Sequence, residues 1–297
     1  MTEDELIGLF GHCSNRGRWG ADDELGTLNY ITDEKRRAAA ALVRTGRAVS
    51  IGRDMSTVPD RVNTDPVRHR MLYDADPPVS ALDSFELSTH GFALTHLDAI
   101  THVFWQGEAY NGQRAADLLS PAGLRSGSVY AQRNGIVTRG VLLDVAAVRG
   151  VPYLASEDTV TAADLSAAEE YAGVRVESGD AVFVHIGLER READQGTEDP
   201  AARAGLDADC LPWLHEREVA VYSGDCVERI PYPSKAVPLP LHQIGLVAMG
   251  LVLLDCPRLA ELVAACEETG RREFMLTVAP LRLRGATGSP ANPLCLF

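Results

Sequence analysis

The sequence has few of the features of a membrane-bound, secreted or nucleic-acid-binding protein. It contains no run of 18 apolar residues, and its longest apolar stretch, around 244–256, is too short to span a bilayer. The N-terminal MTEDELIGLFG is acidic and has no cationic region before an apolar core, so we expect no signal peptide. A formal net charge of −14 argues against nucleic acid or an anionic membrane as a partner. We expect a cytoplasmic protein that acts on a small molecule.

Common nucleophiles and thiolate metal sites are also poorly represented. The six cysteines form no C-x2-C pair, so neither a zinc–thiolate site nor a disulfide framework is expected. Only Cys13 has a histidine beside it, His12, and no serine lies in a G-x-S-x-G motif. The sequence therefore disfavours covalent catalysis by cysteine or serine.

What the chain does contain is an alternation of helix and strand patterns. Residues 32–46 and 161–173 begin with threonine caps and end in glycine, which predicts helices. Strands are predicted over 47–55, 86–98, 135–146, 178–187, 218–225, 251–256 and 274–283, and further helices over 241–250 and 257–270. Residues 56–80 indicate a long loop. We expect one α/β domain over 1–297 with a mixed sheet flanked by helices, and residues 1–30 as an N-terminal arm or lid.

The segment THLDAITH, residues 95–102, has two histidines and an aspartate close together in an otherwise apolar region. On a strand, His96 and Asp98 project from the same face, as two ligands of a divalent metal would. His102 reaches them only if the strand ends near Asp98 and a turn follows, because a helical turn brings positions 98 and 102 together. The spacing predicts two ligands before a bend and a general base after it. The alternative explanation is a structural hydrogen-bond network.

The same segment resembles the signature H-x-G-T-H-x-D-x-P-x-H of the cyclase family of metal-dependent hydrolases, which includes bacterial kynurenine formamidase and isatin hydrolase. Other segments resemble a longer branch of that family: RWGADDELGTLNYIT, GIVTRGVLLD, VESGDAVFVHIG, PLPLHQIGL, GLVLLD and APLRLRGATGSPANP. The resemblance runs in order from about Trp19 to Phe297. It implies the family's swivelling β/β/α fold, a homodimer or larger homo-oligomer, and a bound metal.

The resemblance also implies roles for particular residues. His96 and Asp98 match metal ligands, His102 the catalytic base or acid, and His242 a downstream ligand. Asp255 lies near a metal-binding glutamate of the formamidases. The first signature histidine is replaced by Phe92, which favours one ion over two, with Gln243 or Asp255 completing the site. His90 substitutes only if the strand bulges. His185, where the family often has R-T-G, is a candidate substrate contact.

The expected chemistry follows from these ligands. Imidazole and carboxylate groups suit one zinc or manganese ion, which activates water and polarises a carbonyl, while His102 transfers the proton. The aromatic residues Phe104, Trp105 and Tyr110 are candidates for a substrate wall, or for core packing. We therefore expect hydrolysis of a small cyclic or aryl amide, lactam or ester. Two alternatives are a metal-dependent cyclase or dehydratase and a non-catalytic binding protein on the same fold.

Overall fold

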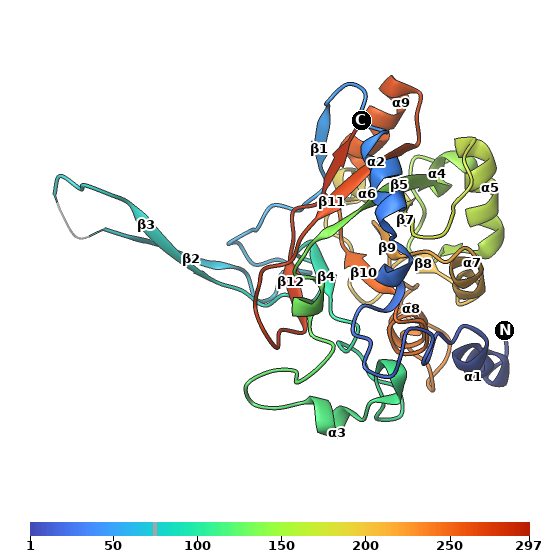
Figure 1. Ribbon diagram of the computed structural model, residues 1–297. Coiled ribbons are helices and arrows are strands. Elements are labelled where there is room, and N and C mark those ends of the chain that lie inside the picture. Colours follow the sequence, from blue (N-terminus) through green and yellow to red (C-terminus); the bar gives the residue numbers. More distant parts are fainter. Residues whose placement is uncertain (74–75) are drawn as a thin grey trace.

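The computed structural model describes residues 1–73 and 76–297 and centres on one mixed sheet (Figure 1). Its strand order is β1-β13-β11-β5-β7-β9-β10-β4-β12. The strands of this sheet are β1 (Ala48–Ser50), β4 (His96–Asp98), β5 (Ile136–Asp144), β7 (Ala181–His185), β9 (Val221–Gly224), β10 (Val252–Asp255), β11 (Glu273–Val278), β12 (Gly288–Pro290) and β13 (Leu294–Leu296). Four further strands form two separate pairs: β2 (Arg68–Leu72) with β3 (Leu82–Glu86), and β6 (Thr159–Val160) with β8 (Gly205–Leu206).

The middle of the sheet is parallel and its margins are antiparallel. Strands β5, β7, β9 and β10 run in one direction, whereas β4 lies antiparallel to β10 and β12 lies antiparallel to β4. The carboxyl ends of the parallel strands therefore meet at one edge, the usual place for a site in such sheets. Asp144, His185 and Asp255 are the last residues of β5, β7 and β10.

Helices and short helical turns pack around this sheet. They are α1 (Glu3–His12), η1 (Gly26–Tyr30), α2 (Asp33–Ala40), η2 (Tyr110–Gly112), α3 (Ala115–Leu118), η3 (Val129–Gln132), α4 (Val145–Val148), α5 (Ala162–Ala172), α6 (Leu188–Gln195), α7 (Cys210–Glu216), α8 (Pro240–His242), η4 (Gln243–Met249) and α9 (Ala260–Thr269). None of the helices in the described part of the chain has both the length and the apolar character needed to cross a bilayer.

Local sequence explains where the best-marked helices begin and end. Thr161 and Asp164 form a reciprocal capping box at the start of α5, and Gly173 ends it in the left-handed conformation. Thr32 caps α2, but this helix ends at Ala40, earlier than the glycine stop predicts. The reason is tertiary: the backbone N–H groups of residues 45 and 46 donate to the carbonyl oxygen of Phe297, which ties this segment to the C-terminus.

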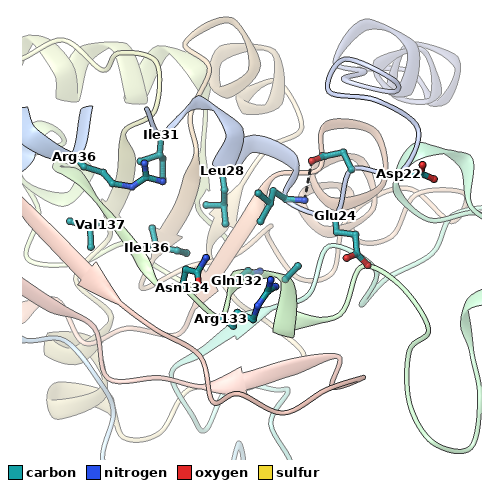
Figure 2. A pocket seen from close by; sticks show the side chains of 14 residues that line it. Asp22, Glu24, Leu28, Ile31, Arg36, Gln132, Arg133, Asn134, Ile136 and Val137 are labelled. Carbon is teal, nitrogen blue, oxygen red and sulfur yellow. Dashed lines mark hydrogen bonds between the residues drawn. The ribbon is translucent and has the colours of Figure 1, made fainter. Parts of the chain in front are cut away.

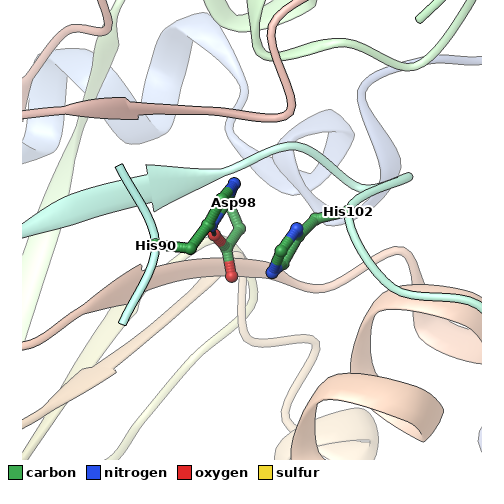
Figure 3. Close-up of side chains that lie close together, drawn as sticks. All are labelled: His90, Asp98 and His102. Atoms are coloured by element: carbon green, nitrogen blue, oxygen red, sulfur yellow. Dashed lines mark ion pairs between the residues drawn. The ribbon is translucent and has the colours of Figure 1, made fainter. Parts of the chain in front are cut away.

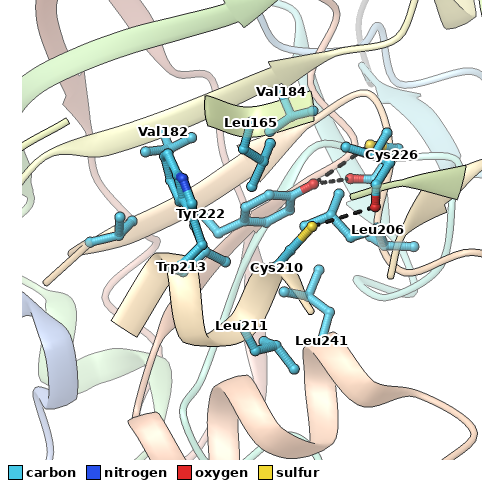
Figure 4. Packing of buried hydrophobic residues seen from close by; sticks show 14 of the residues in the cluster. Leu165, Val182, Val184, Leu206, Cys210, Leu211, Trp213, Tyr222, Cys226 and Leu241 are labelled. Atoms are coloured by element: carbon cyan, nitrogen blue, oxygen red, sulfur yellow. Dashed lines mark hydrogen bonds between the residues drawn. The ribbon is translucent and has the colours of Figure 1, made fainter. Parts of the chain in front are cut away.

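Alternation along the central strands divides the core into two layers. Val182 and Val184 of β7 pack on one side of the sheet, and Ala181 and Phe183 pack on the other. The first layer includes α1, α5 and α7, and Figure 4 shows Tyr222 at its centre, donating its hydroxyl to the Cys226 carbonyl oxygen. Because both faces are covered, the parallel strands are apolar on both sides. The single α/β domain with a mixed sheet is confirmed.

The N-terminal segment is part of this core. Leu6, Leu9 and Cys13 are buried in the layer that contains α1. Thr27 extends the attachment, because its hydroxyl donates to the carbonyl oxygen of Ala220. The structure thus places the start of the chain against the body, while its action as a lid stays a prediction.

Two sequence predictions for residues 56–98 were wrong. The predicted loop over 56–80 contains strand β2, which pairs with β3 in a hairpin that projects from the body (Figure 1). The predicted strand over 86–98 is reduced to β4, because the chain before it is irregular and Gly91 has a φ of 111°. The Thr95 hydroxyl donates to the carbonyl oxygen of Cys256 and anchors this irregular approach. The bend matters for the site, because it changes which side chains reach Asp98.

Candidate metal centre

The chain turns sharply after Asp98, as the spacing of THLDAITH predicts. Strand β4 ends at Asp98, and the backbone N–H of His102 donates to the carbonyl oxygen of Ala99 at 2.9 Å. His102 therefore folds back toward the strand instead of continuing along it (Figure 3). The predicted junction between strand and turn is confirmed.

His96 and Asp98 face each other across one side of β4. The Nε2 atom of His96 lies 3.5 Å from Oδ1 of Asp98, and both side chains are buried. The other ring nitrogen of His96, Nδ1, donates to the carbonyl oxygen of Leu94 at 2.8 Å. This hydrogen bond leaves Nε2 with its lone pair directed at the carboxylate, which is the tautomer that a metal-binding histidine needs.

A distant part of the chain brings His242 to the same place. Its Nδ1 lies 2.9 Å from Glu228, and its Nε2 lies 3.2 Å from Oδ2 of Asp255 and 3.9 Å from Oδ2 of Asp98. Burial lowers the pKa of His242, but the Glu228 and Asp255 carboxylates outweigh that effect and raise the pKa well above its ordinary value. A proton or a cation is therefore stabilised at this ring.

His90 lies inside this group because the chain before β4 is not extended. Its Nδ1 is 3.0 Å from Oδ1 of Asp98, and its Nε2 is 2.9 Å from the hydroxyl of Thr287. Gly288 makes room for the ring, since a Cβ atom there would lie 2.6 Å from it. Phe92, which replaces the first histidine of the family signature, instead packs under the guanidinium of Arg203, 4.0 Å from its ring centroid.

His102 stacks on His90. The two ring centroids are 3.6 Å apart and the planes differ by 3°. Burial and the neighbouring imidazoles lower the pKa of His102 to about 4, although the Asp98 carboxylate opposes this effect. The ring is therefore neutral near pH 7. We refer to the assembled group as the Asp98 cluster; its members are His90, His96, Asp98, His102, His242 and Asp255.

The donors of the Asp98 cluster fit a divalent cation. Both carboxylate oxygens of Asp98, Oδ1 of Asp255 and Nδ1 of His90 are buried without a well-directed hydrogen bond, although imidazole nitrogens lie 3.0 to 3.9 Å from the oxygens of Asp98. Such atoms are costly in a protein interior unless a cation binds them. Ligand atoms of His96, Asp98 and Asp255 lie within 4.8 Å of one another, and so do those of His90, Asp98 and His102. Asp98 belongs to both triads, so it is the central ligand candidate.

Other residues that the sequence singles out lie outside this cluster. Gln243 accepts a hydrogen bond from the backbone N–H of Leu239, the residue before α8. Trp105 stacks on Phe10 of α1, with ring centroids 3.8 Å apart, and Phe104 packs partly buried against the core. Tyr110 is a core residue, 1% exposed, and not part of a substrate wall. Its hydroxyl donates to Asp23.

His185 belongs to a second group at the same sheet edge. Its Nδ1 donates to Oδ1 of Asp144 at 2.9 Å, and its Nε2 lies 4.0 Å from Asp225. Asp225 in turn accepts the backbone N–H groups of residues 186, 187 and 188 at the start of α6. We call these three residues, Asp144, His185 and Asp225, the His185 cluster. Among the described residues, none of its polar atoms is both buried and without a hydrogen-bond partner.

The cavity shown in Figure 2 is a different feature from the metal centre. It has a volume of about 350 Å³ and lies between residues 22–36 and the loop 131–137. No member of the Asp98 cluster lines it. Gln132 provides a link, because its amide Nε2 donates to the backbone carbonyl oxygen of Asp98 at 2.8 Å. The orphaned ligand atoms of the Asp98 cluster therefore lie outside this cavity.

Sequence reasoning missed Glu228. It is 1% exposed and holds His242 through the Nδ1 hydrogen bond described above. No short motif joins positions 228 and 242, because 13 residues, most of them in a loop, separate them in the sequence. The only available signal is chemical: a histidine ligand usually donates its second N–H to a carboxylate or a carbonyl.

Comparisons with known proteins find the same fold. The family model described as "Putative cyclase" matches residues 32–228. A crystal structure described as a novel cyclase superposes with a TM-score of 0.86 at 29% identity, covering 96% of this chain and 99% of that one. Isatin hydrolase A from Ralstonia solanacearum shares the fold, with a TM-score of 0.60 at 22% identity over 89% and 97% of the two chains. An isatin hydrolase bound to thioisatinate gives 0.60 at 18% identity over 87% and 94%. No curated protein sequence matches the chain.

Proposed function

The chain belongs to the "Putative cyclase" family, and from this premise we propose that it is a metal-dependent hydrolase of a small amide, lactam or ester. The observation that carries the proposal is the set of orphaned buried ligand atoms around Asp98. The family's solved relatives include isatin hydrolases, which share this fold. Support for a divalent metal therefore comes both from donors in the chain and from the fold.

We propose that His96, Asp98, His242 and Asp255 hold one divalent ion, zinc or manganese. Mixed imidazole and carboxylate donors suit either ion. A bound ion would supply Lewis acidity toward a substrate carbonyl and toward water. The hydrogen bonds from His96 to Leu94 and from His242 to Glu228 fix both rings. These ligands are therefore oriented before a metal binds.

We assign proton transfer to His102. Its imidazole stacks on His90 next to Asp98, which supports a role in proton transfer beside the proposed ligands. The attacking water forms a bond from its oxygen to the carbonyl carbon and gives its proton to His102. The bond from that carbon to nitrogen or oxygen then breaks, and His102 returns the proton to the leaving atom. Atoms and charge balance without another reactant.

We propose a compact, ring-bearing substrate. Phe104 and Trp105 follow His102 in the chain and are only partly buried, which suits contact with a flat ring. His185 remains a candidate substrate contact at the neighbouring strand end. The substrate panel described next distinguishes amide, lactam and ester substrates.

Purified protein, analysed for metal and then assayed, tests this function. We expect close to one zinc or manganese ion per chain and hydrolysis of at least one member of a panel of aryl formamides, isatin-like lactams and lactones. His96→Ala should lose both the ion and the activity. His12→Ala, a change at an exposed histidine of α1, is the matched control and should keep both.

Two outcomes would overturn the proposal. Bound metal without hydrolysis of any substrate would favour ring closure or dehydration. Absence of metal, together with no effect of His96→Ala on ligand binding or stability, would favour a non-catalytic binding protein.

A further inference from the structure

Three arginine side chains gather around one tyrosine at the border of the cavity in Figure 2. The guanidinium carbons of Arg133, Arg282 and Arg284 lie 5.0, 5.8 and 4.2 Å from the centroid of the Tyr130 ring. Arg282 also donates a hydrogen bond to the backbone carbonyl oxygen of Arg133. We call these four residues the arginine cluster.

The arginine cluster has no counter-charge of its own. Among the described residues, no carboxylate forms an ion pair with any of its three guanidinium groups. Because the three charges surround a single ring, they are close enough to repel one another. In a chain with a formal net charge of −14, such a concentration of positive charge is a local exception. A bound anion would relieve the repulsion.

Arg133 connects this cluster to the cavity, which adds an apolar wall. The cavity has a volume of about 350 Å³, and its lining includes Arg133 together with Leu28, Ile31, Ile136 and Val137. Figure 2 shows these apolar side chains between Arg133 and the segment of residues 22–24. Ligand pockets of this size hold small molecules with a ring or a branched apolar body.

The cavity also has acidic residues, but the fold already uses two of the three. Asp23 accepts the backbone N–H of Gly26 at 2.9 Å. Glu24 accepts the backbone N–H of Gly127 at 2.6 Å. The third acid is exposed to solvent. The end of the cavity at Arg133 is therefore the end that lacks opposite charge.

Gln132 lies between the cavity and the metal centre. It lines the cavity, and its Nε2 donates to the backbone carbonyl oxygen of Asp98 at 2.8 Å. Its Oε1 is buried without a hydrogen-bond partner in the described part of the chain. The amide is thus held from the Asp98 side only, so a molecule in the cavity can fix its position.

The loop that carries Arg284 reaches the metal centre by a second route. Thr287, three residues further along, forms a hydrogen bond with Nε2 of His90 at 2.9 Å. The carbonyl oxygen of Ala286 accepts the backbone N–H of Val129 at 3.0 Å, which joins this loop to η3. Both segments of the arginine cluster are therefore tied to each other and to the Asp98 cluster.

We propose that the arginine cluster and the cavity form a binding site for a small organic acid. Its carboxylate lies on the guanidinium groups, and its apolar body packs against Leu28, Ile31 and Ile136. The bound acid removes the repulsion within the arginine cluster and steadies the two segments that contact Asp98 and His90. Acid in the cavity and zinc at the Asp98 cluster then favour each other's binding. The acid site stands alone; only its effect on zinc rests on the proposed function.

Calorimetric titration with benzoate tests the site, with benzamide as the neutral ligand of the same shape. The site variant is Arg133→Ala with Arg284→Ala, and the variant that keeps the charge is Arg133→Lys with Arg284→Lys. The control, Arg37→Ala with Arg44→Ala, removes the same charge at exposed positions in or near α2. Thermal unfolding checks that every variant is folded.

We expect wild type and control to bind benzoate about 10-fold more tightly than benzamide, as expected for one charge-assisted hydrogen bond. The alanine variant should lose this preference and the lysine variant should keep it. His96→Ala, which removes a proposed metal ligand, should bind benzoate as wild type does, because the acid is not bound to the metal.

Zinc titration against a chelator tests the coupling. Saturating benzoate should tighten zinc binding to wild type by about 5-fold, and it should have no effect on the alanine variant. An unchanged zinc affinity in wild type would overturn the coupling.

Three results would overturn the site itself. They are equal binding of benzoate and benzamide, unchanged benzoate binding in the alanine variant, and loss of benzoate binding in His96→Ala. Binding of inorganic phosphate without binding of benzoate would also overturn it, because the apolar wall would then have no role. Failure of wild type to bind zinc would contradict the proposed function instead, so the two failures are distinguishable.

Discussion

Two groups of histidine and aspartate lie at the same edge of the sheet, yet only one of them is short of partners. In the His185 cluster, Asp225 accepts three backbone N–H groups and Asp144 accepts both the Ala147 N–H and the His185 ring. In the Asp98 cluster, neither oxygen of Asp98 accepts a well-directed hydrogen bond, although Nδ1 of His90 lies 3.0 Å from Oδ1. The same residue types can therefore form a network in which the buried polar atoms have partners, or a site in which some of them do not.

The comparison shows what identifies a metal centre. Residue type and proximity are similar in the two groups, but a satisfied carboxylate has little to gain from a cation, whereas an orphaned one has much. The pKa directions differ between individual rings: the pKa of His242 is raised, like that of His185, and only that of His102 is lowered. Burial opposes a proton on His185, but Asp225 and Asp144 outweigh it and raise the pKa of His185. At His102 burial wins, and the pKa falls to about 4.

The largest effect should come from removing the shared carboxylate. Asp98→Asn should lower metal affinity by more than about 100-fold, because even loss of a residue that only orients a ligand costs up to that much. Activity should fall with it. Asp144→Asn in the His185 cluster is the matched change and should leave metal content intact. Elemental analysis measures the metal content. Equal metal loss in both variants would contradict the assignment of the metal to the Asp98 cluster alone.

His102 should matter to catalysis but not to metal binding. His102→Asn should lower kcat by about 10² to 10⁴, the usual contribution of a general base, with the ion retained. His185→Asn should change kcat by only a few-fold if the second cluster is structural. Steady-state kinetics on metal-loaded protein would decide, and comparable kcat losses in the two variants would contradict the assignment.

An intermediate effect is expected at Glu228, which sequence reasoning did not find. Glu228→Gln keeps the size of the side chain but weakens the hold on His242 Nδ1, so metal affinity should fall about 10- to 100-fold. Titration with zinc against a competing chelator would measure it. Asp225→Asn, also a buried acid-to-amide change, should leave affinity unchanged while lowering stability. If affinity does not move in the Glu228 variant, His242 is not held as a ligand.

The smallest effect is a pH dependence of stability from the His185 cluster. Because the folded-state pKa of His185 is raised, its stabilising contribution is complete below about pH 6.5 and is lost as pH rises through the folded-state value. Denaturant unfolding should show the advantage of wild type over His185→Asn shrinking by on the order of 1 kcal/mol from pH 6.5 to 9. An advantage that stays constant over this range would mean that the ring is not charged in the fold.

Particular residues show which features of the fold and the site could be predicted from the sequence. Alternation and capping residues predicted the mixed α/β sheet and helix α5, because local propensity and core packing agree there. The bend after Asp98 followed from spacing alone. The position of His90 did not, because it depends on an irregular approach that Gly91 and Thr95 set through tertiary contacts. Glu228 was likewise out of reach, because no motif marks its pairing with His242, and the β2–β3 hairpin was missed because the Pro, Asp and Arg residues of 56–80 indicated a loop.

Anomalous diffraction from crystals grown with zinc or manganese tests the central claim most directly. The account predicts one strong peak among His96, Asp98 and Asp255, with the ring of His242 turned toward it and no peak beside His185. A peak at the His185 cluster instead, or none at Asp98 in protein shown to contain metal, would contradict it.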